Sequence, residues 1–129
     1  MDAKSLDAAL ALRPDLREPL DDLLRTLRDG PVESALLDAC DALIRHRVGV
    51  PVDGPVPDVA DSALDDRSGA VLVMAEQFVV DPHGIDPPMR DAVLDHCSMA
   101  ELATLVQAFA MFDALARMEA VLIQRGPET

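Results

Sequence analysis

The chain has 129 residues, half of them hydrophobic, and its 24 acidic and 11 basic side chains give a net charge of −13. This length fits a single domain with a sizeable core, and the hydrophobic fraction excludes a disordered chain. An acidic surface repels phosphate groups, which argues against nucleic acid and against an anionic membrane surface as partners.

The composition also favours helices. There are three Phe and no Trp or Tyr, so the core must be aliphatic, whereas sheets prefer aromatic and β-branched residues. The bias toward Arg and Asp is typical of a bacterial genome rich in G and C. Because the N-terminus lacks a signal-peptide pattern and the longest apolar runs are short, we expect a cytoplasmic protein without a membrane span.

Apolar residues at helical spacing predict six helices in one domain, 1–129. Taken in chain order, these segments are 4–12, 14–29, 31–49, 64–80, a short helix capped by Asp86, and 98–126. Pro19 is expected to kink the second helix or to mark a restart, because it removes a backbone hydrogen bond. The stretch 49–60 contains three prolines and two glycines, so it is predicted to be a loop between two parts of the helical array.

The last segment is the strongest of these. Ser98 and Glu101 have the spacing of a capping box, and Gly126 and Pro127 form a stop signal. A helix over this range would be roughly 40 Å long. Since so long an apolar stripe is not stable alone in water, other helices must cover it.

One polar side chain interrupts that stripe. Asp113 is predicted near the centre of the apolar face, between Phe109 and Ala116, and Arg117 follows one turn later. A buried carboxylate is costly unless it is paired. Two interpretations remain open: an ion pair that holds helices in register, or the polar floor of a ligand pocket.

Other chemical signals are weak. His46 ends a helix between Arg45 and Arg47, a pattern that fits either favourable cations at a helix C-terminus or a small anion site. The three histidines lack the spacing of a helical metal site, and no Gly-rich phosphate loop is present, so no metal and no cofactor is predicted. Cys40 and Cys97 lie in apolar patterns and are expected to be core residues.

Two stretches, LDDRSGAVLVMAEQFVVDPHGID and SMAELATLVQAFAMFDALARMEAVL, resemble the C-terminal part of the carboxymuconolactone decarboxylase and alkylhydroperoxidase D superfamily. Residues 12–49 are similar to the entry helices of that family. Family members often carry Asn at the positions of Asp113 and Ala116. The resemblance implies an all-α, alkylhydroperoxidase D-like array of about six helices with a long C-terminal helix, assembled as a homo-oligomer, either a trimer or a hexamer.

The chain departs from the family at its reactive motif. Redox members have CxxC followed four residues later by His, whereas this chain has Val50-Pro51-Val52-Asp53, with Pro57 at the position of the His. Asp38 occupies the position of a proton-relay acid. Because the thiolate is the nucleophile in such chemistry, peroxide reduction by thiols is disfavoured.

Two functions follow from the resemblance, and a helical protein unrelated to the family remains a third possibility. In the first, the protein binds or transforms a small organic molecule by non-thiol, decarboxylase- or lyase-like chemistry, with Asp38, Asp113 and Arg117 as candidate catalytic residues and with His46 and Arg117 as candidate ligand-binding residues. In the second, it is a catalytically inactive homologue that serves as an oligomeric subunit or scaffold. The sequence leaves open whether the chain is an enzyme.

Overall fold

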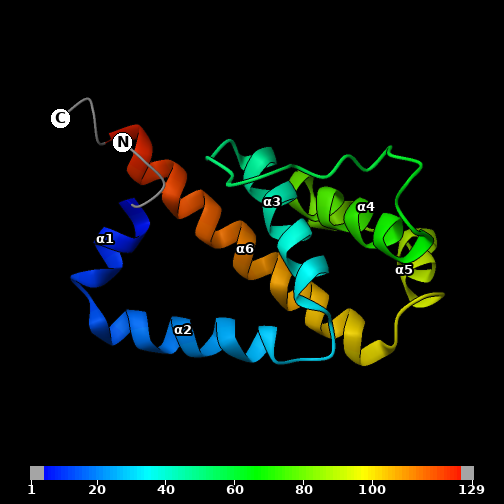
Figure 1. Ribbon diagram of the computed structural model, residues 1–129, viewed down its shortest axis with the longest axis horizontal. Helices are drawn as coiled ribbons and strands as arrows, with labels where there is room; N and C mark the ends of the chain where they lie inside the picture. Colours follow the sequence, from blue (N-terminus) through cyan, green and yellow to red (C-terminus); the bar gives the residue numbers. More distant parts are fainter. Residues whose placement is uncertain (1–4, 126–129) are drawn as a thin grey trace.

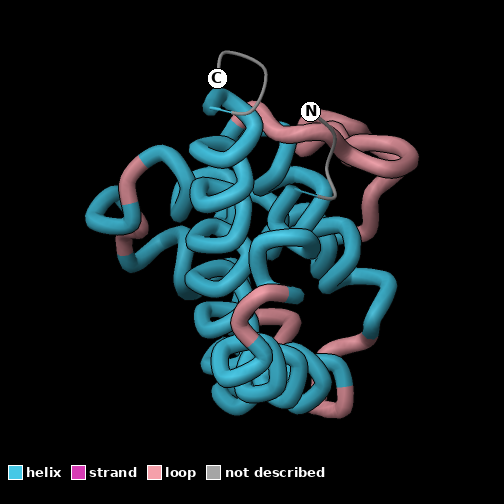
Figure 2. The backbone as a smooth tube through the Cα atoms, turned by 90° about the vertical axis from the view of Figure 1, so that its left-hand side faces the viewer, coloured by secondary structure: helices cyan, strands magenta, loops and turns pink. Residues whose placement is uncertain are grey.

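The computed structural model describes residues 5–125, and over that range the chain consists of helices and loops, with no strand (Figures 1 and 2). The α-helical fold class and the long C-terminal helix are therefore confirmed. The elements in chain order are α1 (Ser5–Ala11), α2 (Pro14–Arg28), α3 (Ser34–Val48), α4 (Asp66–Val80), the short 3-10 turn η1 (Pro82–Gly84), α5 (Pro87–Leu94) and α6 (Met99–Arg125).

Some helix boundaries differ from those predicted. Helix α3 begins at Ser34 rather than at Pro31, because Glu33 has extended backbone angles and its carbonyl accepts the first amides of the helix. Helix α4 begins two residues later than expected, so the connecting loop extends to Asp65. Pro19 does not interrupt α2, since it lies near the start of the helix and is exposed, so that solvent can reach the carbonyl it leaves unpaired.

Side-chain caps account for the helix starts that were predicted correctly. In the capping box, the Ser98 amide donates to Glu101 Oε1 at 2.9 Å and the Glu101 amide donates to Ser98 Oγ at 3.1 Å. The carboxylate of Asp86 accepts from the Met89 amide at 3.0 Å. Gly49 ends α3 with φ of 98°, a left-handed conformation that favours glycine. The predicted stop at Gly126 and Pro127 lies outside the described residues.

The core lies where α3 packs between α4 and α6, and α6 runs across the whole molecule (Figure 1). Phe109 of α6 is fully buried, and its ring lies 5.9 Å from the ring of Phe78 of α4, centroid to centroid. Aliphatic side chains fill most of the remaining interior, as the composition predicts. Helices α1 and α2 lie on the other side of α6, and α2 packs mainly on α1.

Helix α6 is apolar on more than one face. Its most apolar stretch is long and hydrophobic enough to cross a bilayer, with a mean hydropathy of 1.4. One face nevertheless packs into the protein core through Leu105, Ala108 and Phe109, which are fully buried. Only 28 % of that stretch is buried inside the chain, so much of an apolar helix faces outward.

Candidate functional site

The loop of residues 49–65 passes over α3 and α4 (Figure 1). Three surface hollows lie between this loop and the two helices, with volumes of about 440, 330 and 320 Å³. The loop therefore covers hollows rather than filling the space completely. The largest of the three, here called the acidic hollow, has these lining residues: Asp38, Asp41, Ala42, Arg45, Pro51, Val52 and Asp53.

Arg45 makes three side-chain hydrogen bonds in the wall of the acidic hollow. Its Nη1 donates to Glu119 Oε2 of α6 at 2.7 Å, and its Nε and Nη2 both donate to the Pro51 carbonyl, at 3.0 and 2.7 Å. The guanidinium is thus held both by the Glu119 carboxylate of α6 and by the Pro51 carbonyl of the loop. Hydrogen bonding to Glu119 raises the pKa of Arg45, which therefore remains charged.

Glu119 is the only charged residue in the core, as far as the described residues extend, and its side chain is only 2 % exposed. Its Oε1 atom has no hydrogen-bond partner. Burying a carboxylate is tolerated only when a counter-charge lies close, and Arg45 supplies that charge. The pair joins α3 to α6 directly beneath the acidic hollow.

Asp41 lies one helical turn before Arg45 and also lines the acidic hollow. Burial raises the pKa of Asp41, and this effect outweighs the opposing attraction of Arg45 and Arg28. Asp38 and Glu119 add a smaller upward contribution through charge repulsion. A carboxyl group with a raised pKa can exchange a proton nearer to neutral pH than an exposed one, which is what acid–base chemistry requires.

The predicted site residues lie in separate places. Asp38 lines the acidic hollow and pairs with Arg28, whereas His46 lines the smallest of the three hollows. Asp113 and Arg117 form an ion pair on α6, with Nε 3.1 Å from both carboxylate oxygens, and Arg117 also donates to the Val79 carbonyl at 3.2 Å. This geometry fits the interpretation in which the pair fixes helices, here α6 against the end of α4.

Asp113 was predicted near the centre of the apolar face and hence as a buried carboxylate, and this prediction of burial was wrong. Its side chain is 21 % exposed, while Glu119 is the acid that the core encloses. A signal was present in the sequence, since Glu119 follows Phe112 and Ala116 at intervals of four and then three residues. The apolar residues on both faces of α6 obscured which face would be buried.

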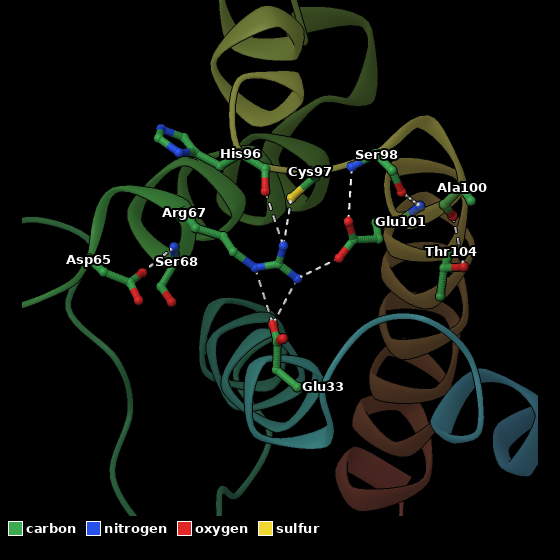
Figure 3. A network of polar contacts seen from close by, with 10 residues as sticks. All are labelled: Glu33, Asp65, Arg67, Ser68, His96, Cys97, Ser98, Ala100, Glu101 and Thr104. Atoms are coloured by element: carbon green, nitrogen blue, oxygen red, sulfur yellow. Dashed lines mark hydrogen bonds and ion pairs between the residues drawn. The ribbon is translucent and has the colours of Figure 1, made fainter.

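A second polar network joins the helices at the other end of the core (Figure 3). Arg67 of α4 donates to Glu101 Oε2 at 2.8 Å and to Glu33 Oε1 at 2.9 Å, so one guanidinium connects α4 to the capping box of α6 and to the start of α3. It also contacts the His96 carbonyl at 3.2 Å and Cys97 Sγ at 3.5 Å. The network uses much of the hydrogen-bonding capacity of Arg67 within the protein, which indicates a structural role.

Both cysteines are buried and unpaired with each other. Burial raises the pKa of Cys40 to about 12, and it also raises the pKa of Cys97. Neither thiol is positioned to form a reactive thiolate near neutral pH. Within residues 5–125, no three His, Cys, Asp or Glu side chains lie close enough together to hold a metal ion.

No protein-family model, curated protein or solved structure matches this chain. The site consists of a guanidinium fixed by a buried carboxylate, beside an aspartic acid with a raised pKa, under a proline-rich loop.

Proposed function

We propose that the acidic hollow binds a small organic molecule and that the protein acts on it by proton transfer without thiols. The observation that carries this proposal is the position of Arg45, which Glu119 and the Pro51 carbonyl hold in the wall of the hollow beside Asp41. A fixed hydrogen-bond donor next to a titratable acid is an arrangement used to polarise and protonate oxygen-containing substrates. The resemblance to the carboxymuconolactone decarboxylase superfamily supports the same chemical class.

The charges that line the acidic hollow favour a neutral ligand over an anionic one. Asp38, Asp41 and Asp53 line the hollow, and the positive charge of Arg45 is already compensated by Glu119. A free carboxylate would be repelled there, whereas a neutral lactone or related carbonyl compound would not. Those N–H groups of Arg45 that Glu119 and Pro51 leave free can donate to a carbonyl oxygen.

Asp41 is the residue assigned to proton transfer. Its raised pKa keeps a larger fraction of the carboxyl protonated than an exposed Asp would have, so it can donate a proton to a bound oxygen and take it back in a later step. The reaction would be of the lyase type, with no redox change, because a decarboxylation would need the carboxylate substrate that the hollow repels. Arg45 would orient the carbonyl group while Asp41 moves the proton.

Titration with a small neutral lactone, followed by NMR shifts of backbone amides, tests the proposal. We expect shifts in 38–45 and 50–53, and we expect Asp41→Asn to weaken binding and abolish any turnover. Asp95→Asn is the matched control, because it removes the same charge at an exposed position that directly follows α5. Binding that is unchanged in Asp41→Asn, or shifts confined to other parts of the chain, would refute the assignment.

A further inference from the structure

An apolar strip runs along the outside of α6 and continues onto α2. On α6, the large members are 41–68 % exposed: Met99, Val106, Met118 and Val121. Ala103, Ala110 and Ala114 lie between them and are also exposed. At the C-terminal half of α6, Met118 and Val121 line one hollow together with Leu16 of α2, and Leu23 of α2 is 56 % exposed on the same helical stripe as Leu16.

The strip is nearly opposite the buried face of α6. At 100° per residue, Met99, Ala103, Ala110 and Val121 fall on one side of the helix, while Leu105, Phe112 and Ala116 fall on the other. Within the described part of α6, Arg117 is the only charged side chain on the strip, and Asp113 at its edge neutralises it. Arg13, which lines the same hollow as Leu16, is paired with Asp15. A protein with a net charge of −13 thus has one long surface with almost no charge.

The strip is large for an isolated chain. Its six large side chains are 41–68 % exposed. Together with the exposed alanines they form a surface on the order of 700 Å², at or above the upper end of the roughly 300–600 Å² that the largest apolar patch on a monomer covers. Each partner in a standard protein–protein interface contributes about 800 Å². The strip therefore has nearly the area that one side of a stable dimer needs.

We infer that this strip is the contact between two copies of the chain, which pair around a two-fold axis close to Ala110 with their α6 helices antiparallel. With the axis there, Met99 of one copy would face Val121 of the other, because the two residues are equally distant from Ala110 in the sequence. Val106 would face Ala114 for the same reason. Small residues near the axis let two helices approach closely, and larger ones cover both ends. The inference does not depend on the acidic hollow.

Charge favours a second copy over other partners. The strip has no free carboxylate, so it is the part of the surface on which two chains of charge −13 repel each other least. The same charge disfavours an anionic membrane. A partner that bound through ion pairs would need unpaired charges on the strip, whereas Arg117 and Arg13 are each paired with an aspartate of this chain.

Light scattering coupled to size exclusion tests the inference on the intact chain. We expect the mass of a dimer for the natural sequence, and we expect Val121→Glu and Ala110→Glu to weaken association roughly a hundredfold or more, because each places a carboxylate in an apolar contact. Val73→Glu on α4, where the valine is 41 % exposed, is the matched control and should remain dimeric. Added salt should strengthen the dimer by screening repulsion between the two copies.

A covalent test gives a positive signal that does not depend on a disrupted variant. Ala110→Cys should form a disulfide-linked dimer under mild oxidation, since two copies of the residue meet near the axis, and Val73→Cys should not. A natural chain that is monomeric at all concentrations, or trimeric, would overturn the inference. So would unchanged association of both glutamate variants with native circular dichroism, or a monomer that binds zwitterionic lipid vesicles.

Discussion

Replacing Arg45 with Met should destabilise the protein far more than replacing any exposed arginine. The change removes the only hydrogen-bond partner that the structure gives to the carboxylate of Glu119, which is 2 % exposed. Breaking a buried pair in this way costs about 3–5 kcal/mol, because the remaining charge has neither water nor a counter-ion. That is a large part of the roughly 5–15 kcal/mol by which a domain is stable.

Replacing Glu119 with Met should lower the free energy of unfolding less than Arg45→Met does. In Glu119→Met, the guanidinium keeps both contacts to the Pro51 carbonyl and is 20 % exposed, so water can solvate it. The double variant Arg45→Met, Glu119→Met should recover much of the loss, since no charge is left buried. Its free energy of unfolding should remain about 1 kcal/mol below that of the natural protein, because the Pro51 carbonyl loses its hydrogen bonds to Arg45.

Urea denaturation followed by far-ultraviolet circular dichroism measures all four proteins, a suitable probe because the chain has no Trp or Tyr. Arg47 and Glu76 form the matched control. They are also an Arg–Glu pair whose arginine lies on α3, but both side chains are more exposed than those of the buried pair. A double-mutant cycle should give a coupling of at least roughly 2–4 kcal/mol for the buried pair and about 0–1 kcal/mol for the control. Equal coupling in the two cycles would refute the argument.

Three further predictions concern single positions. Because burial raises the pKa of Asp41, the folded state holds its proton more tightly than the unfolded state, so this residue lowers stability as the pH rises above about 4; Asp41→Asn should be stabilising near pH 7 and lose that advantage in acid, and identical pH profiles in urea denaturation would contradict this. With the pKa of Cys40 raised to about 12 and that of Cys97 also raised, a thiol-dependent peroxidase assay should show no turnover, and cysteine-dependent turnover would overturn the exclusion. Ser98→Ala should cost about 1 kcal/mol through loss of the capping box with Glu101, and an unchanged urea midpoint would show that the cap does not contribute.

Local signals in the sequence were sufficient to predict the helices. The capping box at Ser98, the Asp86 cap and the Gly49 stop are each determined by residues within one turn, so no tertiary information was needed. The start of α3 was misplaced because Pro31 is compatible with a first helical turn, while the structure uses the extended backbone of Glu33 instead. Glu33 has a second role as a partner of Arg67, which is distant in sequence.

The candidate site was harder to predict because it depends on contacts between distant segments. Arg45 and Glu119 are separated by 74 positions, and nothing in the spacing of either helix pairs them. The raised pKa of Asp41 results from burial, which the sequence pattern of α3 alone does not quantify. Asp38, which the family resemblance suggested as a candidate catalytic residue, lines the acidic hollow but pairs with Arg28.

The two arginine networks set a limit on how the hollows can be tested. Arg45 and Arg67 each line a hollow under the loop, and each also joins α6 to another helix through a carboxylate. Removing either guanidinium would therefore change ligand contacts and helix packing together, and lost binding could not be separated from lost structure. Asp41 and Asp53 line the acidic hollow with no such interhelical ion pair in the described structure, so variants of these two carboxylates can separate recognition from stability.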